Sequence, residues 1–346
     1  MPNTSLDLAP SHLVSLLRSL YTDQQATIRW NNDHSAPFEI KKGVRQGCIL
    51  SPHLFSIYTE QIMREADIEE TGISVGGRKI SNLRYADDTA LCASTHKAAD
   101  QLLQTMNNAE QLKNMKLNAK KTKVMHIGPN VYQPIEIDGE ELEKVDKFKY
   151  LGSVKTNNGD CSTDINTRIA MAKKKMTDLA TIWKDQDLST RLKIKIMKTL
   201  VWSTVMYGSE GWTLKKRDKQ RIQAAEMWFY RRLLRISWTE KRTNKSILTQ
   251  LGIKRELFGL IAKRKASFFG HACRHPNCYL MKDIIQGKMA SKRERGRPRA
   301  KYLDNITEWT GLAPHTIYKR AENRAEWWTD IQRAMRAANF HKDDAE

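Results

Sequence analysis

The sequence has few cysteines and no long hydrophobic run. Its five Cys, at positions 48, 92, 161, 273 and 278, are odd in number and irregularly spaced. This pattern argues against a disulfide framework and predicts a reducing compartment. No apolar run approaches the length of a bilayer span, and nothing near Met1 resembles a signal peptide. We therefore expect a protein that is neither inserted in a membrane nor secreted.

Length and composition predict a folded chain with a substantial core. The chain has 346 residues, of which 40% are hydrophobic, and it contains nine Trp. A disordered chain would have fewer apolar and aromatic residues. At this length we expect about two domains.

Charge is distributed unevenly along the chain. The formal net charge is +20, but residues 1–160 carry 19 Lys or Arg against 20 Asp or Glu. Residues 161–346 carry 40 basic against 19 acidic residues and eight of the nine Trp. A near-neutral part followed by a basic, aromatic-rich part is typical of a scaffold or catalytic region joined to a region that binds nucleic acid. The alternative is a solubilising surface, although mixed charges would serve that purpose without such an imbalance.

Two adjacent carboxylates, Asp87 and Asp88, stand between two largely apolar runs within residues 83–93. On a straight strand their side chains would point to opposite faces, whereas at the tip of a tight hairpin both can face one site. Ionised carboxylates that close repel each other unless a divalent cation binds them, and Mg²⁺ is the natural candidate. An ordinary surface turn is the alternative, but such a turn rarely has apolar residues on both sides.

A glycine-containing loop precedes a predicted helix. Gly43 and Gly47 allow close approach of the backbone to a ligand and leave N–H groups free for an anion. Ser51 followed by Pro52 predicts a helix that runs to about Ala66. A simple structural connection is the alternative for this loop.

Periodicity and turn residues predict the remaining elements. In the first part we expect helices over about 10–22 and 97–115, the latter with Leu102, Leu103, Met106, Ala109 and Leu112 on one face, and hairpins over about 26–40, 73–80 and 135–140. In the second part we expect helices over about 164–183 (Ile165, Ile169, Ala172 and Met176 inward), from Ser189 (Leu192, Ile196 and Leu200 inward) and over about 215–236 (Ile222, Phe229 and Leu233 inward).

Four segments, in order and spacing, resemble the reverse transcriptases of non-LTR (LINE-type) retrotransposons. They are the Gly-x-Arg-Gln-Gly-x-x-x-Ser-Pro loop at 43–52, Tyr85-Ala86-Asp87-Asp88, the Asn-x-x-Lys-Thr-Lys segment at 118–123, and the aromatic turn Phe148 to Gly152. The resemblance implies an RNA-directed DNA polymerase that takes an RNA template, a DNA primer and dNTPs. It implies Asp87 and Asp88 as catalytic metal ligands for two Mg²⁺ ions roughly 3.5–4 Å apart.

The resemblance also implies roles for the neighbouring residues. Lys121 would stabilise the leaving pyrophosphate, although a solvated connection is the better interpretation of its segment taken alone. Nucleotide or template contacts are implied for Arg45, Gln46, Gly47 and Tyr85, and a primer grip for Phe148, Tyr150, Leu151 and Gly152. The aromatic turn can equally be a core strand, and both interpretations can hold together. Lys173 and Lys174 would contact nucleic acid, the alternative being a solvated helix face.

The resemblance implies an α+β fold with three parts: a partial polymerase palm over 1–160, a thumb-like helical bundle over 161–240, and a basic helical region over 241–346. The upstream strand with a third catalytic Asp, and the fingers, have no counterpart in these residues. We therefore expect a C-terminal part that is inactive alone, so enzymatic activity of this chain stays open. A non-catalytic nucleic-acid-binding module and a translated relic are the alternatives. A nuclear or cytoplasmic ribonucleoprotein is the expected location, and nothing indicates the oligomeric state.

Two smaller signals lie near the C-terminus. His271, Cys273, His275 and Cys278 could ligate zinc, but their spacing is tighter than in zinc fingers, and we favour a structural turn. Arg295, Arg297 and Arg299 surround Gly296 and Pro298, a pattern that resembles an AT-hook for the minor groove. A basic linker is the equal alternative, and either should contact phosphates.

Overall fold

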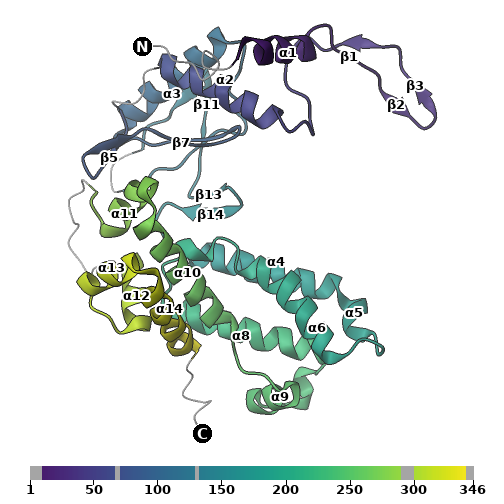
Figure 1. Cartoon of the computed structure of the whole chain (residues 1–346), viewed down its shortest axis with the longest axis vertical. Helices are drawn as coiled ribbons and strands as arrows, with labels where there is room; N and C mark the ends of the chain where they lie inside the picture. The colour runs from purple at the N-terminus through teal and green to yellow at the C-terminus, as the bar shows by residue number, and fades with distance from the viewer. Residues whose placement is uncertain (1–9, 67–70, 129–131, 290–299, 340–346) are drawn as a thin grey trace. The chain divides into compact units, whose positions relative to one another are not determined.

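Two compact units make up the structure. The computed structural model describes residues 10–66, 71–128, 132–289 and 300–339 (Figure 1). The first unit comprises residues 1–73, 79–122 and 133–142, and the second comprises residues 74–78, 123–132 and 143–346. Helices alternate with short two-stranded ribbons in the described residues, so the predicted α+β class is confirmed.

The first unit contains most of the predicted hairpins. Its elements are α1 (Ser11–Tyr21), β1 (Gln25–Ala26), β2 (Arg29–Trp30), β3 (Asp33–His34), β4 (Phe38–Glu39), α2 (Ser51–Ala66), β7 (Asn82–Tyr85), β8 (Asp88–Leu91), α3 (His96–Leu112), β10 (Glu136–Ile137) and β11 (Glu140–Glu141). The hairpin of β5 (Ile73–Val75) and β6 (Arg78–Ile80) belongs to this unit at its base, while its tip is grouped with the second unit. The helix predicted to begin at Ser51 and the hairpin predicted at Asp138-Gly139 are both confirmed.

A small apolar core holds the first unit together. Met63 and Ala66 of α2 pack against Leu102 and Met106 of α3. The prediction that Leu112 shares this face is wrong, because 82% of its side chain is exposed. The buried stripe of α3 continues through Asn107 and Glu110, and at 3.6 residues per turn Leu112 lies on the opposite side of the helix.

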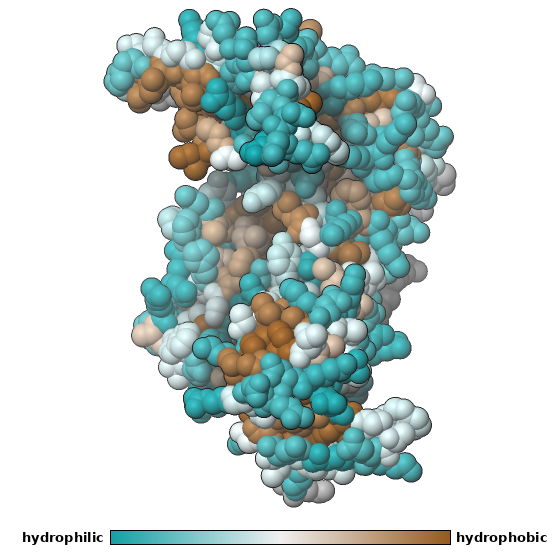
Figure 2. Space-filling model, turned by 90° about the vertical axis from the view of Figure 1, so that its right-hand side faces the viewer, coloured by the Kyte–Doolittle hydropathy of each residue, from teal (hydrophilic) through white to brown (hydrophobic). Residues whose placement is uncertain are grey.

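The segment around α1 leaves much of its apolar surface exposed. No residue of α1 is buried, although the helix itself is where the periodicity predicts it. Leu16, Ile28, Trp30 and Ile49 are each more than half exposed. Figure 2 shows apolar atoms among polar ones in the upper part of the view, at the level of this unit.

The second unit is mainly helical. Its elements are β9 (Lys123–Val124), β12 (Glu143–Lys144), β13 (Lys147–Tyr150), β14 (Ser153–Thr156), α4 (Ser162–Asp178), α5 (Ala180–Lys184), α6 (Thr190–Met197), η1 (Lys198–Trp202), α7 (Ser203–Val205), η2 (Ser209–Gly211), α8 (Lys216–Leu233), η3 (Trp238–Glu240), α9 (Asn244–Leu251), α10 (Leu257–Arg274), η4 (Pro276–Cys278), α11 (Tyr279–Gln286), α12 (Tyr302–Thr310), α13 (Pro314–Glu322) and α14 (Arg324–Asn339). α8 packs against both α4 and α10, and α12, α13 and α14 gather around α10 (Figure 1).

The core of the second unit follows the predicted helical stripes closely. The residues predicted to point inward on the first and third helices are buried: Ile165, Ile169, Ala172, Met176, Ile222, Phe229 and Leu233. The predicted 164–183 helix is divided at Leu179 into α4 and α5. None of the described helices combines the length and the apolar character needed to cross a bilayer.

The predicted inward positions on the middle helix are partly wrong. Leu192 and Leu200 are exposed, and only Ile196 packs against the core. The helix continues beyond α6 as a π-helical turn, η1, whose i to i+5 bonds displace the α-helical register. The buried positions are Met197 and Val201, one residue after the predicted Ile196 and Leu200, and because Met197 belongs to α6 this offset begins before η1.

Candidate active site and nucleic-acid interface

The two carboxylates lie at the tip of a tight hairpin, as predicted. Strands β7 and β8 pair in antiparallel register, with Tyr85 opposite Asp88. Ala86 and Asp87 are therefore the two residues of the turn. Asp87 and Asp88 are both exposed, and no hydrogen bond or ion pair links either carboxylate to another described residue. Their oxygens are therefore available to an external ligand.

The turn has a strained backbone at Ala86. Its φ of 53° lies in the left-handed region, which usually takes glycine. A two-residue hairpin turn needs positive φ at its first central position, so the turn imposes this conformation on alanine. The left-handed conformation costs an L-residue about 1–2 kcal/mol. Strain of this kind is often found at functional sites.

Arg84, an arginine of the carboxylate hairpin, forms an ion pair with α2. Arg84 of β7 donates through Nη2 to Oε2 of Glu60 on α2, at 2.7 Å. Burial alone would raise the pKa of Glu60, but hydrogen bonds from Arg84 and Arg64 outweigh it and lower this pKa. The ion pair therefore joins the carboxylate hairpin to the helix that follows the glycine loop, and it leaves Asp87 and Asp88 unneutralised.

The glycine loop is anchored at both ends. Arg45 donates through Nη2 to the carbonyl oxygen of Leu20, at 3.1 Å, which attaches the loop to the end of α1. Ser51 Oγ donates to the carbonyl oxygen of Arg45, at 2.6 Å. Gly43 and Gly47 have φ of 98° and 85°, so both use the left-handed backbone expected of them. Gln46 is exposed, and within the described residues no hydrogen bond runs directly from this loop to the β7–β8 hairpin.

Lys121 lies in a turn that follows α3 in the same unit. Its backbone N–H donates to Oδ1 of Asn118, at 3.1 Å, and to the Asn118 carbonyl oxygen, at 3.0 Å. The Lys121 residue is exposed, and its ammonium group has no partner among the described residues. The turn chemistry of Asn118 therefore presents this cation to solvent.

The aromatic hairpin of β13 and β14 belongs to the second unit and is held against α4. Leu151 and Gly152 form its two-residue turn, with φ of 47° and 80°. Tyr207 Oη donates to the Leu151 carbonyl oxygen at 3.0 Å, and Arg168 donates to the carbonyl oxygen of Gly152. The Arg168 guanidinium also lies over the Tyr207 ring, 4.3 Å from its centroid. Phe148 and Tyr150 are half-buried on β13.

Sequence reasoning missed the buried acid that anchors this hairpin. Asp164 accepts hydrogen bonds from the N–H of Val154, at 2.9 Å, and from Nε1 of Trp212, at 2.8 Å. Its spacing of four residues from Arg168 on one helix was a visible signal for an interacting pair. The partners from β14 and from the residue after η2 could be identified only from the tertiary structure.

The basic residues of α4 differ in their surroundings. Lys173 places Nζ 5.3 Å from the centroid of the Trp228 ring, and Lys175 donates to Oγ1 of Thr204 at 3.1 Å. Lys174 is exposed and has no partner among the described residues. Lys174 is therefore the member of this cluster whose charge is fully available to a polyanion.

The structure describes one of the two sequence patterns noted near the C-terminus, the possible zinc ligands, but not the AT-hook-like arginines. Arg295, Arg297 and Arg299 lie outside the described residues. His271 and Cys273 are on α10, with His275 and Cys278 just after it, and the two histidine rings are 5.3 Å apart. Among the described residues no group of three or more His, Cys, Asp or Glu is placed to hold a metal ion. Burial raises the pKa of Cys273 to about 11, so its thiol is protonated at neutral pH.

Comparison with known proteins identifies relatives of the chain. Residues 5–154 match the family described as reverse transcriptase (RNA-dependent DNA polymerase). An uncharacterized transposon-derived protein of Caenorhabditis elegans is 25% identical over 287 residues, which cover 75% of this chain and 98% of that protein. The Pol polyprotein of the type-1 retrotransposable element R2 of Nasonia vitripennis is 28% identical over 36% of this chain and 13% of its own length.

A third relative covers more of the chain than the R2 protein does. The probable RNA-directed DNA polymerase from transposon BS of Drosophila melanogaster is 25% identical over 63% of this chain and 25% of its own length. The chain therefore spans nearly all of the worm protein, but a quarter or less of the R2 and BS proteins.

Proposed function

Since residues 5–154 belong to the reverse transcriptase family, we propose that this chain carries part of the active site of a retrotransposon RNA-directed DNA polymerase. The observation that supports this most directly is the β7–β8 turn. It presents two adjacent carboxylates, Asp87 and Asp88, that are exposed and have no partner among the described residues.

The carboxylate pair suits Mg²⁺. This cation binds proteins through one or two carboxylates and keeps water or substrate phosphates as its other ligands. The described residues contain no third His, Cys, Asp or Glu beside the pair. The pair thus fits a part of the expected two-ion site, with Asp87 as the main ligand and Asp88 as a weaker one. Bound there, Mg²⁺ would lower the pKa of the primer 3′-hydroxyl and neutralise charge on the leaving pyrophosphate.

The neighbouring groups of the first unit would orient the substrates. Tyr85 is 68% exposed beside the carboxylates and offers a flat surface for a base or sugar. Arg45, Gln46 and Gly47 would contact the incoming nucleotide or the template. Lys121 would pair with the triphosphate, because its ammonium group has no protein partner among the described residues.

We further propose that the second unit holds the template–primer. The β13–β14 hairpin would act as the primer grip, with its turn at Leu151 and Gly152 kept rigid by Tyr207 and Arg168. Helices α4 to α8 would form a thumb-like bundle, and Lys174 would contact phosphates. The associated RNA would make the assembly a ribonucleoprotein.

A second candidate function is binding of nucleic acid without polymerisation. The lack of a third metal-ligating residue around Asp87 and Asp88 among the described residues favours it. The excess of basic residues after position 160 would supply binding affinity independently of any chemistry.

Primer extension on an RNA template, in the presence of Mg²⁺ and dNTPs, tests the first proposal. We expect Asp87→Asn to reduce any extension by several orders of magnitude, since a catalytic metal ligand is lost. Asp33→Asn is the control, because Asp33 directly follows a two-residue hairpin turn of the same unit, opposite Trp30, as Asp88 does opposite Tyr85.

The binding of the same template–primer distinguishes the two candidates. Extension that depends on Asp87 supports the polymerase. Salt-dependent binding without extension supports the binding module, and the absence of both contradicts both proposals.

A further inference from the structure

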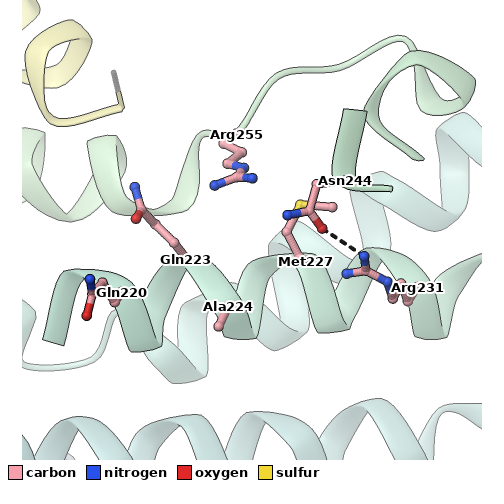
Figure 3. A pocket seen from close by; sticks show the side chains of 7 residues that line it. All are labelled: Gln220, Gln223, Ala224, Met227, Arg231, Asn244 and Arg255. Carbon is pink, nitrogen blue, oxygen red and sulfur yellow. Dashed lines mark hydrogen bonds between the residues drawn. The ribbon is translucent and has the colours of Figure 1, made fainter. Parts of the chain in front are cut away.

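A cavity of about 300 Å³ lies in the second unit, beside α8. Its walls are formed by Gln220, Gln223, Ala224, Met227 and Arg231 of α8, Asn244 of α9, and Arg255 of the segment between α9 and α10 (Figure 3). Two guanidinium groups thus face one cavity, and no carboxylate lines it. This combination indicates an anionic ligand.

Arg255 is the most unusual residue of this cavity. Its side chain points from the segment above toward α8 in Figure 3, and only 7% of the residue is exposed. Its buried Nε donates to no acceptor among the described residues. Because a buried cation without an acceptor is costly, the guanidinium group of Arg255, which lines the cavity, is suited to an oxygen that a ligand would supply.

Arg231 is already oriented for binding. Its Nη2 donates to Oδ1 of Asn244, at 2.7 Å, and to the carbonyl oxygen of Arg242, at 3.3 Å. Its Nη1 and Nε make no hydrogen bond with described residues and can donate to a ligand. Holding a guanidinium in place before binding reduces the entropy lost when the ligand binds.

The acids nearest in sequence form no hydrogen bond with either guanidinium group, and the buried Oε2 of Glu226 has no hydrogen-bond partner among the described residues. Glu256 forms an ion pair with Lys198, with 2.8 Å between Oε2 and Nζ. Glu226 accepts through Oε1 from the N–H groups of Glu256 and Leu257, at 2.8 and 3.0 Å, and so caps the start of α10. Glu226 does attract Arg255 electrostatically, but no hydrogen bond joins them. Both guanidinium groups therefore retain donors for an external anion.

We propose that this cavity binds a phosphate group, with Arg255 and Arg231 as its two cationic donors. Guanidinium groups match phosphate oxygens with paired N–H donors, and the amides of Gln223 and Asn244 add polar contacts. The phosphate can belong to a nucleic-acid backbone or be a free phosphate. The cavity is built from the second unit alone, so this proposal does not depend on polymerase activity.

Substitution of Ala224 tests the charge preference without removing any existing contact. Ala224 is exposed on α8, and both Glu and Gln are good helix formers, so Ala224→Glu and Ala224→Gln should fold equally well. The two variants add side chains of the same size to the cavity and differ only in charge. Arg232→Gln is a further control. It lowers the net charge of the protein by the same amount as Ala224→Glu does, but at the exposed residue that follows Arg231 in the sequence.

The measurement is equilibrium binding of a fluorescein-labelled single-stranded oligothymidylate over a range of salt concentrations. We expect Ala224→Glu to bind about tenfold more weakly than Ala224→Gln, because one charge-assisted contact is lost. Its slope of log affinity against log salt should be shallower by about 0.7, as for one phosphate contact on a single strand. Arg232→Gln should resemble the unmodified protein more closely.

A parallel thermal-unfolding series with inorganic phosphate, at constant ionic strength, identifies the source of the phosphate. Loss of oligothymidylate affinity in Ala224→Glu supports a nucleic-acid phosphate. A phosphate-dependent rise in Tm that is present in Ala224→Gln and absent in Ala224→Glu supports a free phosphate. Equal behaviour of the Glu and Gln variants in both measurements would overturn the proposal.

Discussion

The substitution Lys265→Met is expected to change the pH dependence of stability. Lys265 lies on α10 and is completely buried. Its Nζ donates to the carbonyl oxygen of Trp212, at 2.7 Å, and to Oδ1 of Asn305, at 2.8 Å. No ion pair with a carboxylate is present for Lys265 among the described residues. Burial accordingly lowers its pKa to about 7.

The sign of the effect follows from the two pKa values of Lys265. In the unfolded chain the pKa is about 10.4, whereas in the folded protein it is about 7. Between these values the unfolded state binds more protons, so the free energy of unfolding rises with pH. Below pH of about 7 both states are protonated, and the contribution becomes constant. From about pH 7 to about pH 9 the predicted gain is on the order of 2 kcal/mol.

Urea unfolding followed by tryptophan fluorescence measures this gain directly. Lys265→Met should remove it, so that the difference in stability between the variant and the unmodified protein changes with pH. Lys195→Met is the control, because Lys195 is an exposed residue on α6 whose ammonium group has no partner among the described residues. Parallel pH profiles for Lys265→Met and the unmodified protein would show that the pKa of Lys265 is not lowered.

Two further substitutions probe the carboxylate turn and the start of α10. Ala86→Gly should raise the free energy of unfolding of the first unit by about 1 kcal/mol, measured by urea unfolding, because glycine relieves the left-handed strain at φ of 53°; an unchanged or lower stability would contradict the strain. Glu226→Ala should lower the stability of the second unit by about 2–4 kcal/mol, since one part-buried and one buried N–H group at the start of α10 lose their acceptor. Glu226→Gln retains an acceptor oxygen, so similar losses for both variants in calorimetry would exclude the cap as the cause.

Local sequence patterns predicted the elements that form the candidate site. A pair of aspartates between two apolar runs predicted the hairpin tip now seen at Asp87 and Asp88. Ser189 was expected to begin a helix, and its Oγ accepts a hydrogen bond from the Leu192 N–H. Such features depend on residues within a few positions of each other, so they can be inferred without knowledge of the fold.

These local patterns do not predict contacts between segments that are distant in the sequence. Leu192 and Leu200 were predicted to be buried, but Met197 and Val201 are the residues that lie in the core. Asp164 was predicted only to lie at the start of a helix, whereas its carboxylate accepts hydrogen bonds from both Val154 and Trp212. Neither partner lies on the helix of Asp164.

The amino-acid sequence alone therefore predicted the turns, the helix starts and the resemblance to reverse transcriptases. These depend on local hydrogen bonding and on residue order. Only the tertiary structure decided that Arg168 and Tyr207 hold the turn at Gly152, and that Arg255 and Arg231 face the same cavity. Burial and the pairing of charges depend on which surfaces pack together, and that packing is a property of the whole fold.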